Sequence, residues 1–212
     1  MNCDGIARWY RALEYLEFGQ ALERRRLEYL NDVADARHVL ILGDGDGRFT
    51  AEFVRRNSGA TVESVDLSVK MIAMASKRVG GFSTNVRFRV GDARSIAFEG
   101  KYDLVVTHFF LDCFENDELN GLVGRVAERC DAGARWVISE FGLPESGIER
   151  GAAWVLVRFM YFCFWLTTGL IVNRLPDYAC AFERQGFRVV RRRVAMGGLL
   201  VSEIRERRLI GA

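Results

Sequence analysis

The stretch that decides the fold, residues 39–47, reads Val39-Leu40-Ile41-Leu42-Gly43-Asp44-Gly45-Asp46-Gly47. Its apolar residues predict a buried strand, and the three alternate glycines predict a tight turn after it. A helical pattern then begins at Arg48 and is expected to run to about Asn57. A strand, a glycine-rich turn and a helix in this order bind nucleotides in α/β proteins. The glycines allow close backbone approach, and the helix N-terminus presents free N–H groups.

The spacing of the glycines narrows the ligand. It is G-x-G-x-G here, whereas a dinucleotide fingerprint has G-x-G-x-x-G. Arg48 stands where that fingerprint has its third glycine. The difference favours an adenosine ligand other than NAD.

Length, charge and residue counts limit the classes of protein to which this chain can belong. The chain has 212 residues, of which 50% are hydrophobic, and its net charge is +2. This length favours a single domain over residues 1–212, and the balanced charge gives no reason to expect a nucleic-acid partner. Five scattered cysteines without a CxxC pair and only two histidines predict no metal site. We see no signal-peptide pattern and expect a cytoplasmic protein.

Hydrophobic periodicity predicts alternating strands and helices. A helix is expected over residues 6–33. Strands are expected over 38–42, 61–66, 86–90, 102–107 and 135–141, with helices over 48–57, 68–78 and 117–130 and a turn at 131–133. A short helix over 176–185 and two strands over 187–195 and 199–206, joined as a hairpin, follow. The pattern predicts an α/β protein with a doubly wound parallel sheet.

These segments together resemble a class I S-adenosylmethionine (SAM) methyltransferase, from about residue 6 to residue 207. The glycine-rich turn resembles the first motif of the family, and Asp66 resembles the acidic residue that ends its second strand. Residues 91–93, 102–106 and 186–187 resemble the end of the third strand, the fourth strand and the start of the sixth. The resemblance implies a seven-stranded, mostly parallel Rossmann-like sheet with an antiparallel C-terminal hairpin. It also implies an N-terminal helical lid (residues 1–35) and a helical cap insertion (residues 145–185).

The implied cofactor is SAM, with S-adenosylhomocysteine (SAH) as product. Asp66 lies about 20 residues past the glycines, where a carboxylate accepts hydrogen bonds from ribose hydroxyls. The full set of expected cofactor-binding residues is Gly43, Asp44, Gly45, Gly47, Asp66, Leu67, Met71, Asp92, Ala93 and Thr107. In this set Leu67 and Met71 flank the adenine, Asp92 and the Ala93 N–H bind its edge, and Thr107 lies beside the methionine part.

The family usually has an acidic residue two positions before the first glycine, where this chain has Ile41. Asp44 and Asp46 are expected near the cationic sulfonium, and Asp44 is the expected substitute for the missing acid. This departure leaves the contacts at the methionine end open.

Two residues are candidates for a general base, which is needed only if the acceptor must lose a proton. His108 ends the fourth strand, and histidine is the natural base at neutral pH. A packed structural role for His108 is an equal alternative. Asp112, on the loop that follows, is the second candidate.

An aromatic segment over residues 154–172 predicts an apolar substrate. Tyr161 and Trp165 are candidate substrate contacts there, and Tyr10, Tyr15 and Phe18 are candidates in the N-terminal helix. Ordinary core packing or a dimer interface are the alternatives, and the segment is short for a membrane span. Contact with a membrane surface is compatible with the sequence but not favoured. The arginine clusters at 24–26 and 191–193 are expected to be solvated.

The sequence thus predicts a methyltransferase that acts by in-line displacement on a small or medium, apolar acceptor. Two other classes stay open: a nucleotide-dependent oxidoreductase and a non-catalytic SAM-binding protein. The sequence does not identify the acceptor, the acceptor atom (oxygen, nitrogen or carbon) or the oligomeric state, and a homodimer is compatible with it.

Overall fold

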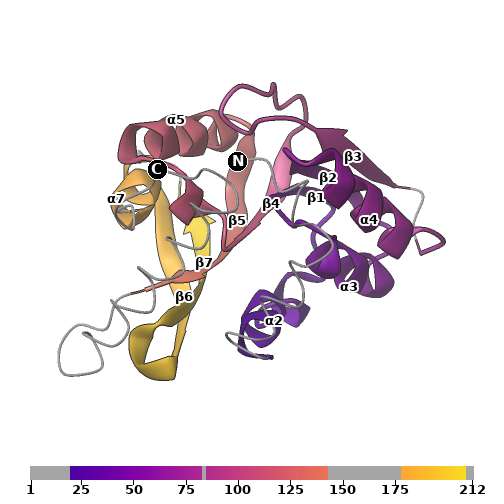
Figure 1. The fold of residues 1–212 in the computed structure, drawn as a ribbon. Helices are drawn as coiled ribbons and strands as arrows, with labels where there is room; N and C mark the ends of the chain where they lie inside the picture. The colour runs from indigo at the N-terminus through magenta and orange to yellow at the C-terminus, as the bar shows by residue number, and fades with distance from the viewer. Residues whose placement is uncertain (1–19, 83–84, 143–177, 209–212) are drawn as a thin grey trace.

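The computed structural model describes residues 20–82, 85–142 and 178–208, and a seven-stranded sheet runs through these segments (Figure 1). The order of the strands is β3-β2-β1-β4-β5-β7-β6. The first five are parallel, and β7 is antiparallel to both of its neighbours. The strands are β1 (His38–Leu42), β2 (Thr61–Asp66), β3 (Val86–Val90), β4 (Tyr102–His108), β5 (Cys130–Phe141), β6 (Phe187–Ala195) and β7 (Leu200–Arg207).

The order of the strands determines where a ligand can bind. The chain winds outward from β1 through β2 to β3 and then returns to β4, which lies on the other side of β1. Between β1 and β4 the connections leave in opposite directions. In open parallel sheets, ligands bind at such a switch point, outside the carboxyl ends of the strands.

Helices cover both faces of the sheet (Figure 1). The α3 and α4 helices pack together on one face, and α5 and α7 pack together on the other. The helices are α2 (Ala21–Arg26), α3 (Arg48–Arg56), α4 (Val69–Val79), α5 (Asn116–Ala127) and α7 (Tyr178–Arg184), with short 3-10 turns η1 (Asn31–Val33), η2 (Leu111–Cys113) and η3 (Met196–Gly198). None of the helices in the described residues is long and apolar enough to cross a membrane.

The β1 strand shows why this sequence makes the central strand. Val39 and Ile41 pack into the core on the α3 side, and Leu40 and Leu42 pack into the core on the α5 side. Side chains alternate between the faces of a strand, so a strand covered on both faces is apolar at successive positions. The sequence pattern predicted this, and β1, β2 and β3 have the predicted bounds.

The start of β5 corrects the sequence prediction. The α5 helix ends at Ala127, and β5 begins at Cys130, so the predicted turn at 131–133 lies within the strand. Cys130 pairs with Tyr102, and the register shifts before the next pair. Gly133, with φ of 77°, lies in this irregular part, which explains why a strand residue resembles a turn residue.

The helix predicted over residues 6–33 is also shorter where it is described. The α2 helix ends at Arg26. The chain then turns, so that Tyr29, Leu30 and Val33 pack into the core on the α3 side of the sheet. The rest of the predicted lid and most of the predicted cap insertion fall in residues 1–19 and 143–177, outside the described residues.

Candidate active site

A cavity opens at the carboxyl ends of the parallel strands. Segments that follow β1, β2, β3 and β4 line it, and we call it the edge cavity. The described residues that line it are Gly43, Gly45, Val65, Asp66, Leu67, Met71, Gly91, Asp92, Ala93, Arg94, Phe109, Phe110, Cys113 and Phe114. Most of the expected cofactor-binding residues are among them, namely Gly43, Gly45, Asp66, Leu67, Met71, Asp92 and Ala93.

The glycine turn, residues 43–47, needs glycine for two different reasons. Gly43, Gly45 and Gly47 have φ of 70°, 60° and 80°, which favours glycine at each. A Cβ on Gly47 would also lie 2.7 Å from the Cα of Ala75 in α4. Gly47 therefore allows α3 and α4 to pack closely. The structure places it in helix packing and not in the lining of the edge cavity.

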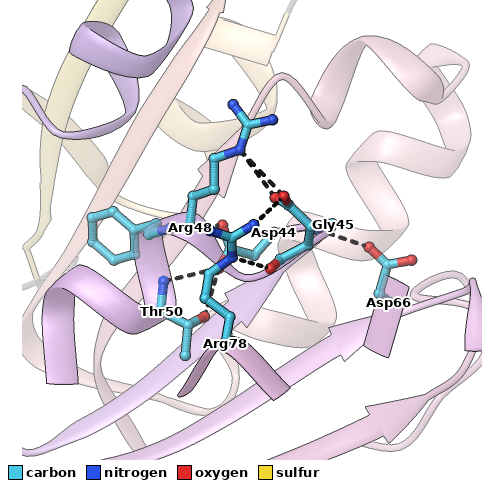
Figure 2. Close-up of polar contacts among 8 residues, drawn as sticks. Asp44, Gly45, Arg48, Thr50, Asp66 and Arg78 are labelled. Atoms are coloured by element: carbon cyan, nitrogen blue, oxygen red, sulfur yellow. Dashed lines mark hydrogen bonds and ion pairs between the residues drawn. The ribbon is translucent and has the colours of Figure 1, made fainter. Parts of the chain in front are cut away.

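Asp66 ties the end of β2 to the glycine turn (Figure 2). Its Oδ2 accepts a hydrogen bond from Gly45 N at 3.2 Å, and its Oδ1 accepts one from Ser68 N at 2.9 Å. A carboxylate offers about four lone-pair sites, more than these two hydrogen bonds use. Asp66 is partly exposed and lines the edge cavity.

Asp92 is held in place by a residue that sequence reasoning missed. Arg94 donates to its carboxylate from the backbone N–H at 2.9 Å and from the guanidinium at 2.8 Å. Arg94 also forms an ion pair with Glu118 at 3.2 Å. The hydrogen bonds from Arg94 lower the pKa of Asp92 despite its partial burial. Asp92 is thus an ionised acceptor in the cavity wall.

Comparisons with known proteins agree with this geometry. The model of a family described as a methyltransferase domain matches residues 39–133. A demethylmenaquinone methyltransferase from Thermus thermophilus is 30% identical over 149 residues, which are 69% of this chain and 64% of the relative. These matches support the resemblance to class I SAM-dependent methyltransferases that the sequence predicted.

Two further proteins, one similar in sequence and one in fold, define how far the likeness extends. A trans-aconitate 2-methyltransferase from Delftia acidovorans is 37% identical over 89 residues, which are 41% of this chain and 31% of the relative. Human N-acetylserotonin methyltransferase, solved in complex with SAM, matches in fold with a TM-score of 0.65 at 15% identity, over 96% of this chain and 56% of that chain. The chain spans less than two thirds of the length of these curated relatives.

Asp44 has a different role from the one expected for a methyltransferase turn. Its buried carboxylate accepts hydrogen bonds from Phe49 N at 3.2 Å, Thr50 N at 2.8 Å and the Thr50 hydroxyl at 2.6 Å (Figure 2). It therefore satisfies the free N–H groups in the first turn of α3. Asp44 is not among the described residues that line the edge cavity, and Ile41 is buried in the core. That Asp44 replaces the missing acid stays a prediction.

The Asp46 carboxylate likewise makes contacts within the fold. Its carboxylate forms ion pairs with Arg48 at 3.1 Å and with Arg78 of α4 at 2.5 Å. Arg78 also donates to the backbone oxygen of Asp46 at 2.8 Å. These contacts fix the glycine turn against α4. Asp46 is not among the described residues that line the edge cavity.

Thr107 and His108 end β4 but do not reach the edge cavity. The Thr107 hydroxyl accepts a hydrogen bond from the Trp136 indole at 3.0 Å, inside the core. His108 packs edge-on against Phe49, with ring centroids 5.0 Å apart. Neither of its ring nitrogens has a hydrogen-bond partner among the described residues. Burial, with a smaller effect from the charge of Arg26, holds the pKa of His108 well below its usual value.

Asp112 lies next to the cavity wall. It is the middle residue of η2, and its Oδ1 accepts a hydrogen bond from the thiol of Cys113 at 3.6 Å. Cys113 itself lines the edge cavity. The expected substrate contacts Tyr10, Tyr15, Phe18, Tyr161 and Trp165 lie outside the described residues.

Two features of the site were not predicted from the sequence. Phe109, Phe110 and Phe114 give the cavity an aromatic wall, for which two adjacent phenylalanines after a strand were an available signal. Arg26 was expected to be solvated with its neighbours, but it is 5% exposed and lies 5.5 Å from the centroid of the Phe109 ring. The arginines at 191–193, by contrast, have the expected exposed side chains.

Proposed function

We propose that this chain transfers a methyl group from SAM to a small or medium, apolar acceptor. The observation that carries the proposal is the edge cavity, where the glycine turn, Asp66 and Asp92 meet at the switch point of the sheet. The family model and the relatives, all named as methyltransferases, support the reaction class.

The residues of the edge cavity fit SAM. In the proposal the Asp66 carboxylate accepts from the ribose hydroxyls, because it lines the edge cavity and is held there by the N–H groups of Gly45 and Ser68. Leu67 and Met71 flank the adenine. A Cβ added at Gly45 would meet only the Met71 sulfur, at 3.8 Å, so the backbone is open to a ligand at this point.

SAM, when bound, supplies an activated methyl group that the acceptor nucleophile takes by in-line displacement, with SAH as the leaving group. The protein then has to orient the two reactants and exclude water. Where the acceptor must lose a proton, Asp112 is the better placed of the two candidate bases. It is partly exposed beside the cavity wall, whereas His108 is enclosed in the core.

The aromatic wall supports an uncharged, apolar acceptor. Phe109, Phe110 and Phe114 supply apolar surface, and Arg94 is the one cationic side chain among the described lining residues. Arg94 is already paired with Asp92 and Glu118, so it is poorly suited to neutralise a polyanionic acceptor. A phenol or quinol therefore fits better than the tricarboxylate named for one of the relatives.

The test is transfer of a labelled methyl group from SAM to phenols and quinols, with trans-aconitate in parallel. We expect transfer to an apolar acceptor, and Asp66→Asn should raise the KM for SAM by about tenfold or more through loss of charge-assisted hydrogen bonds. Asp131→Asn, at an exposed site on the opposite end of β5, is the matched control and should leave KM unchanged. Transfer to trans-aconitate alone would contradict the proposed acceptor class, and an unchanged KM in Asp66→Asn would contradict the proposed cofactor site.

A further inference from the structure

Glu140 is a buried carboxylate that the proposed function has not used. It lies near the carboxyl end of β5 and is 2% exposed. Its Oε1 accepts hydrogen bonds from Phe110 N at 3.0 Å and from Leu111 N at 2.8 Å. One side chain from β5 therefore holds two successive N–H groups of the chain that follows β4. We call that segment, residues 109–111, the phenylalanine turn.

The phenylalanine turn is strained and forms part of the edge cavity. Phe109 has φ of 53°, a left-handed conformation that costs a residue with a side chain about 1 kcal/mol. Its ring packs against Phe141 with centroids 5.0 Å apart. The Phe110 ring covers Gly43 so closely that a Cβ on Gly43 would lie 2.2 Å from it. Such a conformation persists only where its surroundings fix it, and it is concentrated at functional sites.

The second oxygen of Glu140 argues against a purely stabilising role. Oε2 is buried and has no hydrogen-bond partner among residues 20–82, 85–142 and 178–208. Burial and the nearby negative charge of Asp112 raise the pKa of Glu140 well above its usual value. An apolar residue would avoid the cost of burying this carboxyl group but could not bind the two N–H groups.

We propose that Glu140 is a positioning residue of the methyltransferase site, whose carboxyl group holds the phenylalanine turn against Gly43 and so sets the shape of the edge cavity. The proposal rests on the proposed function, because it treats the edge cavity as the cofactor site. Glu140 acts through Phe110 and does not itself line the cavity.

Three substitutions separate this role from a general loss of stability. Glu140→Leu removes the acceptor and leaves two buried N–H groups without a partner. Glu140→Gln keeps an acceptor oxygen in the same place and no charge. Glu63→Gln alters another buried carboxylate, which lies on β2 and accepts a hydrogen bond from the Tyr102 hydroxyl at 2.8 Å, far along the chain from the turn.

The readouts are the hydrogen-exchange rate of backbone amides in residues 107–115 and the SAH affinity measured by titration. In Glu140→Leu we expect exchange about tenfold faster and SAH affinity about tenfold weaker, as for one lost hydrogen bond to a charged or buried group. In Glu140→Gln we expect both within about twofold of wild type, and in Glu63→Gln an unchanged affinity. If Glu140→Leu does not fold, Glu140→Asp, which is one methylene too short, should show the same losses.

Exchange and affinity that are unchanged in Glu140→Leu would overturn the proposal. An equal loss of affinity in Glu63→Gln would also overturn it, because the effect would then be one of stability. A wild-type protein that does not bind SAH would instead contradict the proposed function, and the role of Glu140 at a cofactor site would fall with it. Equal SAH affinity in wild type and in Glu140→Leu would contradict only the role of Glu140 and would leave the proposed function standing.

Discussion

The glycine turn and the phenylalanine turn lie at the same edge of the sheet, and one buried carboxylate holds each of them. Asp44 accepts from the N–H groups of Phe49 and Thr50, and Glu140 accepts from those of Phe110 and Leu111. Asp44 lies five and six residues from its donors, whereas Glu140 lies 30 and 29 residues from its donors. The same physical arrangement is therefore local in one turn and depends on the finished fold in the other.

The two carboxylates also differ in how completely they are bonded. Both oxygens of Asp44 accept hydrogen bonds, one of them also from the Thr50 hydroxyl. One oxygen of Glu140 has no partner in the part of the chain that the structure describes. A fully bonded buried group stabilises the fold, whereas a partly bonded one is more often retained for function. We therefore expect substitutions of Asp44 to act on stability and substitutions of Glu140 to act on the cavity.

The largest expected effect comes from Asp44→Ala. The change leaves two buried N–H groups and one hydroxyl without an acceptor, and it should lower the free energy of unfolding by about 3 kcal/mol. Urea denaturation measures it. Thr50→Val removes only the hydroxyl and should lower it by about 1 kcal/mol. Equal losses in the two variants would show that Asp44 does not hold the backbone of α3.

A smaller effect separates two glycines of the same turn. Gly47→Ala places a Cβ 2.7 Å from backbone and side-chain atoms of Ala75 and should lower the free energy of unfolding by about 2 kcal/mol. Gly45→Ala meets only the Met71 sulfur at 3.8 Å and should lower it by about 1 kcal/mol through its positive φ. In titrations with SAH the order should reverse, since Gly45 lines the edge cavity and Gly47 does not. A larger loss of affinity in Gly47→Ala would contradict this assignment.

The smallest effect is a pH dependence that distinguishes Glu140. Its pKa is raised in the folded state, first by burial and then by Asp112, so the folded protein holds this proton more tightly than the unfolded chain. The free energy of unfolding therefore falls as pH rises from about 4.5 toward the folded-state pKa. Glu140→Gln lacks this loss, so its stability relative to wild type should increase between pH 4.5 and pH 7.

Other charged groups near Glu140 do not change the sign of that prediction. Tyr178 of α7 faces Glu140 and Glu203, and Arg205 of β7 lies beside them. Asp44 also has a pKa raised by burial, and it contributes equally to wild type and to Glu140→Gln. Thermal unfolding of both proteins across this pH range measures the difference, and parallel curves would contradict a raised pKa of Glu140.

Most features that could be predicted from the sequence depend on local signals, and most features that were missed do not. The bounds of β1, β2 and β3 and the place of Asp66 could be predicted, because apolar runs and spacing from the glycines are local signals. The start of β5 was missed because its pairing with Tyr102 is irregular. The capping role of Asp44 was missed because charge suggested a ligand contact, and Glu140 because its donors lie on another strand connection.

The central claim is that the edge cavity binds SAM and SAH, and calorimetric titration with SAH tests it most directly. For wild type we predict saturable binding of one SAH per chain, with no comparable binding of NADH. Asp66→Asn should bind SAH at least about tenfold more weakly, and Asp131→Asn should bind it as wild type does. Binding of NADH without binding of SAH, or SAH binding that is unaffected by Asp66→Asn, would contradict the account.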